Sequence, residues 1–463
     1  MELKEHRRFP LFHDRYRYFI LLISLLCLTS ISSNMLTFNF AIICMATPKN
    51  MTEAPLHSTY DFTATETSSL IWAVAVGSMI ATFPFSIGYN HYGAQHVFVG
   101  AGLLSIISTA ITPLAIYLGY YYFLSVRFLQ GVSYAADFAA IGMIITRWSS
   151  LKQHAFYISV LTCYSPLSST LTNSVSGFIC SSSLGWPFIY YFHALVGCLL
   201  FGCWAIFYND HPKTNNYVSP VELEKIERGK EKEQLDLSIK IPYLKIVTNP
   251  VVLTVWLNAF AEISSAIFLL TYTPLYLRNV HGFSIKSTGL LSSLPTTLNM
   301  PTRILLGYVS DKIKFISEPT KLKIFNTFSV FGPALCYAAI SFTPQEEHEI
   351  AVALLSGVSI FYAGTAGGFY KAATKSCLQF SHFVIASIQF IKCITLFLAP
   401  LLVAIFVQDL ASPASWRKIF LIFTISQTVA AALFLWLGTD KPQDFTRVAP
   451  PQKRKCSLMP SVL

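Results

Sequence analysis

Twelve apolar stretches of about twenty residues alternate with polar segments along this 463-residue chain. A helix needs about 20 mainly apolar residues to cross ~30 Å of hydrocarbon, and only helices or closed barrels satisfy the backbone polar groups in lipid. The pattern therefore predicts an all-α, multi-pass membrane protein. The expected spans are residues 18–45, 68–88, 97–119, 121–146, 154–180, 186–208, 250–276, 286–308, 324–343, 349–370, 381–407 and 415–438.

The longest polar segment between spans, residues 209–249, divides the twelve spans into two groups of six. Ser219, Pro220 and Glu222 in this segment have the spacing of a helix N-terminus, so we expect a short surface helix there. The expected division of the chain is an N-tail, an N-terminal six-helix bundle, a linker, a C-terminal six-helix bundle and a C-tail, at residues 1–17, 18–208, 209–249, 250–438 and 439–463.

The basic residues orient these helices. Of 33 Lys and Arg residues, 25 fall in the tails and alternate loops expected inside, and five fall in the loops expected outside. Short cytoplasmic loops retain positive charge, so both tails should be cytosolic. This bias also accounts for the net charge of +10, and nucleic acid is not an expected partner. Only 12% of residues are charged, against about 25% in soluble domains, so no soluble domain is expected.

The first loop on the outside carries Asn50-Met51-Thr52, an N-glycosylation acceptor sequence, which would place Asn50 in a lumen. The membrane expected is then the plasma membrane or a lysosomal or vesicular membrane. The ten cysteines include no C-x-x-C pair and lie mostly in or beside the spans. We interpret them as small apolar residues at helix interfaces rather than a disulfide framework or metal site, and we expect no cofactor and no metal.

One loop motif supports a family resemblance. Residues 307–312, GYVSDK, resemble the G-x-x-x-D-[RK] loop of major facilitator transporters, and residues 88–93, GYNHYG, resemble a degenerate second copy. The resemblance implies two six-helix bundles with a substrate site between them. It also implies a gating charge cluster of Arg303 and Asp311. A solvated loop Asp without this role is the alternative.

A closer resemblance is to the anion/cation symporter family, which includes sialin, the vesicular glutamate transporters and the type I sodium–phosphate transporters. The runs LLTYTPLYL at 269–277, GLLSSLP at 289–295 and RFLQG at 127–131 are similar to motifs of that family. The chain departs from the family pattern at Met35, where an Arg is usual, and at Tyr134, where the proton-coupling Glu is usual. The nearest carboxylate is Asp137, so this chain is a divergent member.

Charged residues inside a membrane are costly and usually face a cavity or a partner. Glu262 and Lys392 should each lie ~16 Å deep from the cytosolic side and are expected to meet. Glu262 is the predicted coupling residue, with Asp137 as the competing site. Arg127 is predicted to hold an anion. The alternatives are a static salt bridge for Glu262 with Lys392, and structural roles for Arg127 and Asp137.

The predicted substrate-binding residues are Arg127, Tyr134, Tyr272, Lys392 and Asn39, although aromatic residues at helical spacing are also typical of a packed core. We expect a secondary transporter that moves a small solute, an organic anion or phosphate, by alternating access coupled to H⁺ or Na⁺. The chain lacks a G-x-x-x-x-G-K-[ST] loop, which argues against an ATP-driven pump, and no enzymatic activity is expected. The alternatives are a sensor or scaffold that retains the fold without transport, and a channel.

Overall fold

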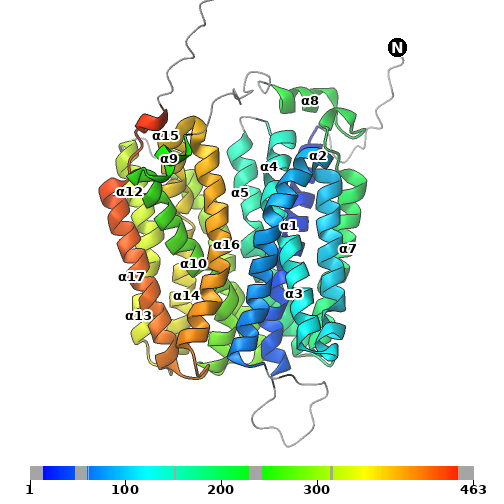
Figure 1. Ribbon diagram of the computed structural model, residues 1–463, viewed down its shortest axis with the longest axis vertical. Helices are drawn as coiled ribbons and strands as arrows, with labels where there is room; N and C mark the ends of the chain where they lie inside the picture. Colours follow the sequence, from blue (N-terminus) through cyan, green and yellow to red (C-terminus); the bar gives the residue numbers. More distant parts are fainter. Residues whose placement is uncertain are drawn as a thin grey trace, which may run out of the picture.

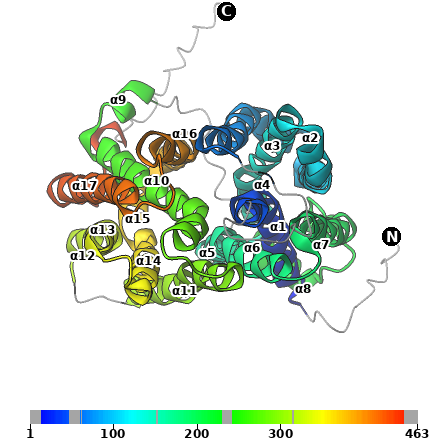
Figure 2. The ribbon, with the colours of Figure 1, turned by 90° about the horizontal axis from the view of Figure 1, so that it is seen from below.

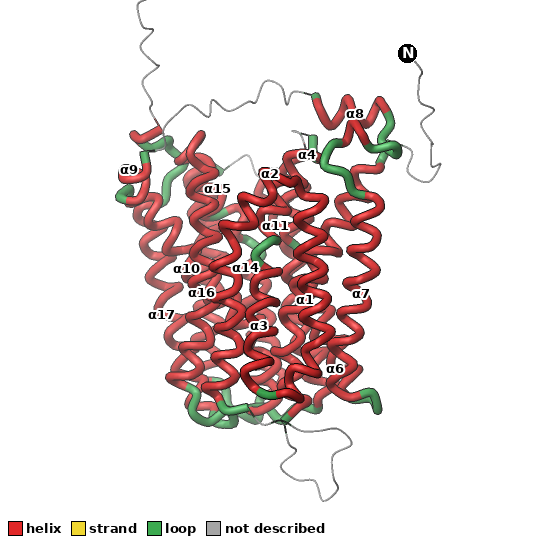
Figure 3. The backbone as a smooth tube through the Cα atoms, turned by 45° about the vertical axis from the view of Figure 1, so that its right-hand side comes forward, coloured by secondary structure: helices red, strands yellow, loops and turns green. Residues whose placement is uncertain are grey.

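In the described part of the chain, every regular element of the computed structural model is a helix, and the long helices run side by side in two bundles (Figures 1 and 3). This confirms the predicted all-α fold with twelve crossings. Eight crossings are long and apolar enough to span a membrane by length and composition alone. The structure describes residues 14–46, 60, 62–150, 153–228, 242–312 and 316–446.

Six crossings form the N-terminal bundle. One helix, α2, makes two of them and bends at Gly93, whose φ of +78° suits glycine. Two other crossings are each made of two consecutive helices. The elements are α1 (Tyr16–Met45), α2 (Ala64–Leu118), α3 (Tyr120–Tyr134), α4 (Asp137–Trp148), α5 (His154–Thr162), α6 (Tyr164–Cys180) and α7 (Gly185–Phe207).

The other six crossings form the C-terminal bundle, and two of them are again interrupted. The elements are α10 (Pro250–Asn279), α11 (Ile285–Lys312), α12 (Glu318–Asn326), η4 (Thr327–Phe331), α13 (Gly332–Phe342), α14 (His348–Tyr362), η5 (Thr365–Gly367), α15 (Phe369–Cys377), η6 (Leu378–Phe380), α16 (Ser381–Phe406) and α17 (Pro413–Leu437). A short η7 (Asp444–Thr446) follows them.

Between the bundles the chain forms η2 (Pro212–Thr214), α8 (Pro220–Glu227) and α9 (Tyr243–Val247). We call the end of the molecule that carries α8 and α9 the linker end, and the opposite end the far end (Figure 1). The predicted surface helix is confirmed as α8, because the Ser219 side chain accepts a hydrogen bond from Glu222 N at 3.1 Å. The Glu222 carboxylate accepts hydrogen bonds from Tyr16 N and Arg17 N, and so caps α1.

A second carboxylate caps the helix that follows the bend in α2. Asp210 accepts hydrogen bonds from Ala94 N at 2.7 Å and from Gln95 N at 3.2 Å. These amides follow the bend at Gly93 and would otherwise lack partners. Asn90 stands at the acidic position of the degenerate 88–93 motif, so an acidic residue that caps a helix here comes instead from the segment after α7.

The structure corrects the interpretation of the cysteines. Cys44 at the end of α1 and Cys180 at the end of α6 form a disulfide, with their Cα atoms 6.1 Å apart. Both residues lie at the far end. The disulfide ties the first and fifth crossings together, so these two cysteines are covalent crosslinks rather than apolar packing residues.

The two bundles meet along α6 with α11 and along α2 with α16 (Figure 2). Ser174 Oγ lies 3.0 Å from Ser293 Oγ, and Trp72 Nε1 donates to the Phe397 carbonyl at 3.1 Å. Glycine permits the closest approach, because a Cβ on Gly289 would lie 2.6 Å from the Asn173 carbonyl oxygen. All of these contacts are in the halves of the helices toward the far end.

The apolar core has the same asymmetry. In the far half, buried residues of the C-terminal bundle such as Phe268 and Leu396 belong to one continuous cluster with those of the N-terminal bundle. Toward the linker end, the C-terminal bundle has a separate cluster that includes Val255, Ala373 and Phe434. The bundles are therefore packed together at the far end, while their cores are separate at the linker end.

Candidate functional site

Three crossings are interrupted in the middle of the protein. The fourth crossing has a turn at residues 135–136, immediately after Tyr134, and the fifth has a turn at Cys163, immediately before Tyr164. The tenth crossing is interrupted between Tyr362 and Phe369. The turns at Ala135 and Cys163 keep right-handed helical dihedrals and backbone hydrogen bonds, so the fourth and fifth crossings continue in nearly the same direction. The tenth crossing has a longer break, and discontinuous helices are typical of solute sites in membrane transport proteins. Of the candidate charged residues, Asp137 lies at one of these turns, whereas Arg127, Glu262 and Lys392 lie within helices.

Asp137 begins α4, directly after the turn of the fourth crossing. Its side chain is fully buried, and neither carboxylate oxygen has a hydrogen-bond partner in the structure. The Lys392 ammonium acts electrostatically on this carboxylate. A buried charge without hydrogen bonds is costly, so Asp137 is stable here only with a proton or with a nearby positive charge.

Lys392 reaches from the C-terminal bundle into the N-terminal bundle. Its Nζ on α16 donates a hydrogen bond to the Tyr164 hydroxyl at 3.1 Å and lies 4.8 Å from the centre of the Tyr134 ring. Lys392 also acts electrostatically on Asp137. One ammonium of the eleventh crossing therefore interacts with residues of the fourth and fifth crossings. Lys392 is thus one charged side chain that contacts the opposite bundle at this depth.

Glu262 on α10 is buried, and its Oε2 atom has no hydrogen-bond partner in the structure. The positive charge that acts on it is Arg303 of α11, and Tyr370 of α15 is close to both. The expected pairing of Glu262 with Lys392 is therefore corrected. Lys392 acts electrostatically on Asp137 across the bundles and Arg303 acts on Glu262 inside the C-terminal bundle, although in neither case do these described side chains form a direct ion pair.

Arg127 makes structural contacts. Its guanidinium donates to the Met35 carbonyl of α1 at 2.9 Å, to the Leu70 carbonyl of α2 at 3.3 Å and to Gln130 Oε1 at 2.6 Å. It also stacks on the Phe38 ring at 5.1 Å and is only 1% exposed. These contacts fit the alternative of a structural Arg that bonds adjacent helices better than they fit an anion site.

Two other predicted substrate-binding residues lie apart from this group of charges. The Tyr272 ring is buried against Phe268 and Trp416 within the C-terminal bundle, which fits the alternative of a packed aromatic core. Asn39 is buried in α1, and its Oδ1 atom has no hydrogen-bond partner in the structure. A role of Asn39 in substrate binding stays a prediction.

The predicted gating pair is described only in part. Arg303 faces Glu262, whereas Asp311 lies eight residues farther along α11, ~12 Å away along the helix axis. The side chain of Asp311 lies outside the described residues, so its pairing with Arg303 stays a prediction. Asn50 also lies outside the described residues, and its glycosylation stays a prediction.

Sequence reasoning missed Tyr164, Tyr370 and the pairing of Lys392 with Asp137. A tyrosine within an apolar span carries no special signal, because tyrosine is common in packed cores. The turn before Asp137 was not visible either, because residues 135 and 136 are both alanine, which strongly favours helix.

Comparisons with known proteins agree with this architecture. The family model described as Major Facilitator Superfamily matches residues 21–400. Among solved structures, a D-xylose-proton symporter aligns with a TM-score of 0.69 at 15% identity, covering 92% of this chain and 100% of the symporter chain. At this identity the structural likeness shows the fold alone.

Two curated relatives from Mus musculus extend the comparison. The chain is 24% identical to a probable small intestine urate exporter over 393 residues, which cover 84% of this chain and 79% of the exporter. It is 26% identical to sodium-dependent phosphate transport protein 3 over 284 residues, which cover 60% of this chain and 59% of that protein. Both relatives are named for anionic solutes.

Proposed function

Since this chain belongs to the Major Facilitator Superfamily and is a solute transporter, we propose that its solute is a small organic anion or phosphate, carried together with a proton. The observation that carries the proposal is the position of Lys392. Its ammonium bonds Tyr164 and lies near Asp137, so it joins the two bundles beside the interrupted helices. The names of the urate and phosphate relatives agree with an anionic solute.

Charge balance explains why an anion and a proton would bind together. With Asp137 ionised, its charge balances that of Lys392. When Asp137 takes up a proton, the Lys392 ammonium has a positive charge in excess, and an anion restores neutrality in a low-dielectric site. The tyrosine hydroxyls at positions 134 and 164 would donate hydrogen bonds to that anion. The proton and the anion then cross the membrane together, and their charges cancel.

We propose Asp137, rather than Glu262, as the residue that carries the proton. Asp137 faces an ammonium on the opposite bundle, so movement of the bundles changes its environment directly. Glu262 faces Arg303 on the neighbouring helix of its own bundle, and this pair can move as a unit. A proton suits Asp137 better than Na⁺, because no other oxygen is hydrogen-bonded or paired to this carboxylate in the structure.

The test is transport by the purified protein in liposomes, with pH, Na⁺ and voltage gradients imposed separately over phosphate and a panel of organic anions. The wild-type protein should accumulate one of these anions under an inward proton gradient. Asp137→Asn should reduce accumulation by at least tenfold while exchange of labelled for unlabelled anion continues, because exchange need not return an empty, deprotonated carrier.

Two further variants make this test decisive. Asp440→Asn removes a carboxylate outside the membrane spans and should leave accumulation unchanged. Glu262→Gln should retain proton-driven accumulation. If Glu262→Gln loses accumulation and Asp137→Asn keeps it, the coupling role belongs to Glu262. Absence of saturable flux under every gradient would overturn the proposal of anion transport. It would favour the alternative of a sensor or scaffold that retains the fold without transport.

We propose further that the linker end faces the cytosol. The excess of Lys and Arg in the tails and linker supports this orientation. The Cys44–Cys180 disulfide at the far end supports it as well, because disulfides persist on the oxidising side of a membrane. In sealed vesicles with cytosolic side outward, protease should cleave within residues 209–249. Cleavage there only from the lumenal side would reverse the orientation.

A further inference from the structure

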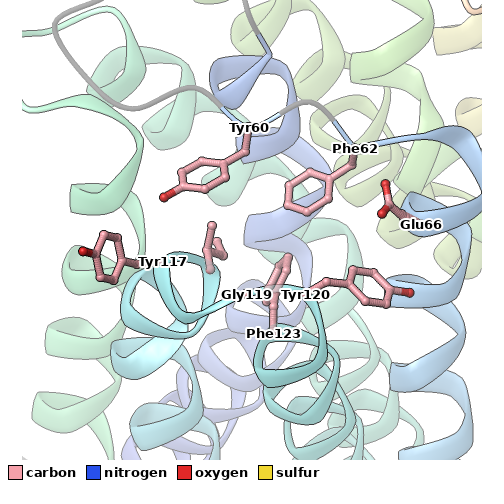
Figure 4. Close-up of a pocket in the computed structure, with 8 residues that line it drawn as sticks. Tyr60, Phe62, Glu66, Tyr117, Gly119, Tyr120 and Phe123 are labelled. Atoms are coloured by element: carbon pink, nitrogen blue, oxygen red, sulfur yellow. The ribbon is translucent and has the colours of Figure 1, made fainter.

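A pocket of about 280 Å³ lies at the far end of the N-terminal bundle, separate from Asp137 and Lys392 (Figure 4). One wall is formed by Tyr60, Phe62 and Glu66, and the other is the junction between α2 and α3. Figure 4 shows the side chains of both walls around the junction at Gly119. The side chains used in the argument are those of Tyr60, Phe62, Glu66, Tyr117, Tyr120 and Phe123.

Contacts of Tyr60 and Phe62 hold the pocket in shape. Tyr60 N donates a hydrogen bond to the Met45 carbonyl at 2.9 Å, one residue after the disulfide-bonded Cys44, and the Tyr60 ring packs edge-on against Trp186. The Phe62 ring lies 6.0 Å from the Phe123 ring. The aromatic walls are therefore largely preorganised, which lowers the cost of binding a ligand.

The described lining of the pocket carries a negative charge. Among these lining residues Glu66 is the charged one, and no Lys or Arg is included. Its Oε2 atom accepts hydrogen bonds from Thr63 N and Thr63 Oγ1, both at 2.9 Å, which fix the carboxylate at the start of α2. Aromatic faces add a negative potential to that of the carboxylate. An anion is disfavoured here, and a cation is favoured.

The kind of cation follows from the lining. A metal ion such as Na⁺ needs several oxygen ligands, whereas this pocket is mostly lined by rings. Aromatic rings with one carboxylate match an organic ammonium, whose methyl or methylene groups contact the rings while its charge faces the carboxylate. We propose that this pocket binds an organic ammonium group, as a site separate from the transport pathway. The group is that of a free amine or of a lipid headgroup.

The proposal can be tested with tetramethylammonium as the probe and the purified full-length protein in detergent. Isothermal titration calorimetry at constant ionic strength should show saturable binding of tetramethylammonium chloride but not of sodium chloride. Glu66→Gln should weaken binding about tenfold through loss of the charge. Glutamine is also compatible with the Thr63 capping box, so this variant should fold.

Two more variants separate the pocket from general effects. Phe62→Leu should also weaken binding, because it removes a ring and keeps an apolar side chain. Glu349→Gln removes an exposed carboxylate at the far end of the other bundle and should leave binding unchanged. The proposal is overturned if tetramethylammonium binds no better than Na⁺, or if Glu66→Gln binds it as tightly as the wild type.

The two sources of the ammonium group are distinguished in lipid nanodiscs. An anionic phosphatidylglycerol surface concentrates the probe equally for wild type and Glu66→Gln, so the readout is the difference in binding between these two proteins. A phosphatidylcholine headgroup in the pocket would compete with the probe and make this difference smaller in phosphatidylcholine than in phosphatidylglycerol discs. An equal difference in the two lipids assigns the pocket to a free amine. Because the readout is binding, the result does not depend on whether anion transport is confirmed.

Discussion

At the scale of single residues, Arg127 connects three helices through one guanidinium. It bonds the carbonyls of Met35 and Leu70 and the side chain of Gln130. Lysine keeps the charge but has a single nitrogen, so it cannot reproduce this planar set of donors. We expect Arg127→Lys to destabilise the protein by about 2–4 kcal/mol, because buried carbonyls lose charged partners. A thermal-unfolding curve in detergent measures this loss.

A substrate-affinity measurement on the folded fraction of Arg127→Lys completes this prediction. If the role is structural, the affinity should change less than twofold. Arg303→Lys is the matched control, because Arg303 is half-buried and faces Glu262 rather than backbone carbonyls. An Arg127→Lys protein with normal stability and lost anion binding would instead restore the anion site expected from the sequence.

The candidate charges were predictable from the sequence, but their partners were not. Asp137, Glu262 and Lys392 were identified because a charge in an apolar span is costly. Position along a helix gives the depth of each residue, and Glu262 and Lys392 have similar depth. The direction in which a side chain points depends on helix packing and on local breaks. Helix packing places Asp137 where the Lys392 ammonium acts on it electrostatically, a pairing that position along the helix alone does not predict.

At the scale of elements, the number and order of helices followed from hydropathy, while some helix ends did not. The ninth crossing begins at Glu318, six residues before the predicted span. Its first turn is polar and is stabilised by ion pairs of Glu318 with Lys321 and Lys375. Lys321 also donates to the Ser310 carbonyl. An apolar window cannot detect a helical turn that is held by charges.

The turn between α10 and α11 provides a prediction on pH dependence. His281 Nδ1 lies 3.1 Å from His348 Nδ1. Protons on both nitrogens would repel each other at this distance, so protonation of both rings is disfavoured. Burial lowers the pKa of His281, a hydrogen bond to the Gln345 carbonyl raises it, and His348 lowers it further. The other groups in contact or adjacent in sequence are the Tyr276 hydroxyl, the carboxylates Glu346, Glu347 and Glu349, and the guanidinium of Arg278.

The sign of the effect follows from the lowered pKa. The unfolded chain binds a proton at His281 more readily than the folded protein does, so stability is complete above about pH 6.5 and decreases as pH falls below it. The melting temperature should therefore fall between pH 7.5 and 5.5. His281→Gln should reduce this fall, whereas His96→Gln, on α2 near the linker end, should not. An unchanged fall in His281→Gln would contradict the prediction.

At the scale of the whole molecule, the two bundles are closed against each other at the far end. Hydrogen bonds of α6 with α11 and of α2 with α16, together with one continuous apolar cluster, lie in that half. If the linker end is cytosolic, this arrangement is closed toward the outside. Alternating access then requires the contacts at the far end to separate, while the packing inside each bundle is kept.

A crosslink at the far end tests this motion. Ser174 Oγ and Ser293 Oγ lie 3.0 Å apart on opposite bundles, so Ser174→Cys with Ser293→Cys should form a disulfide or accept a short thiol crosslinker. The crosslink should hold the far end closed and reduce net transport by at least tenfold, because the loaded site cannot open to that side. A reductant should restore transport, and each single variant should transport normally under the same oxidant.

Mass spectrometry should confirm the crosslink, because the chain contains ten native cysteines. Full transport by completely crosslinked protein would mean that α6 and α11 need not separate, and that the far end opens elsewhere.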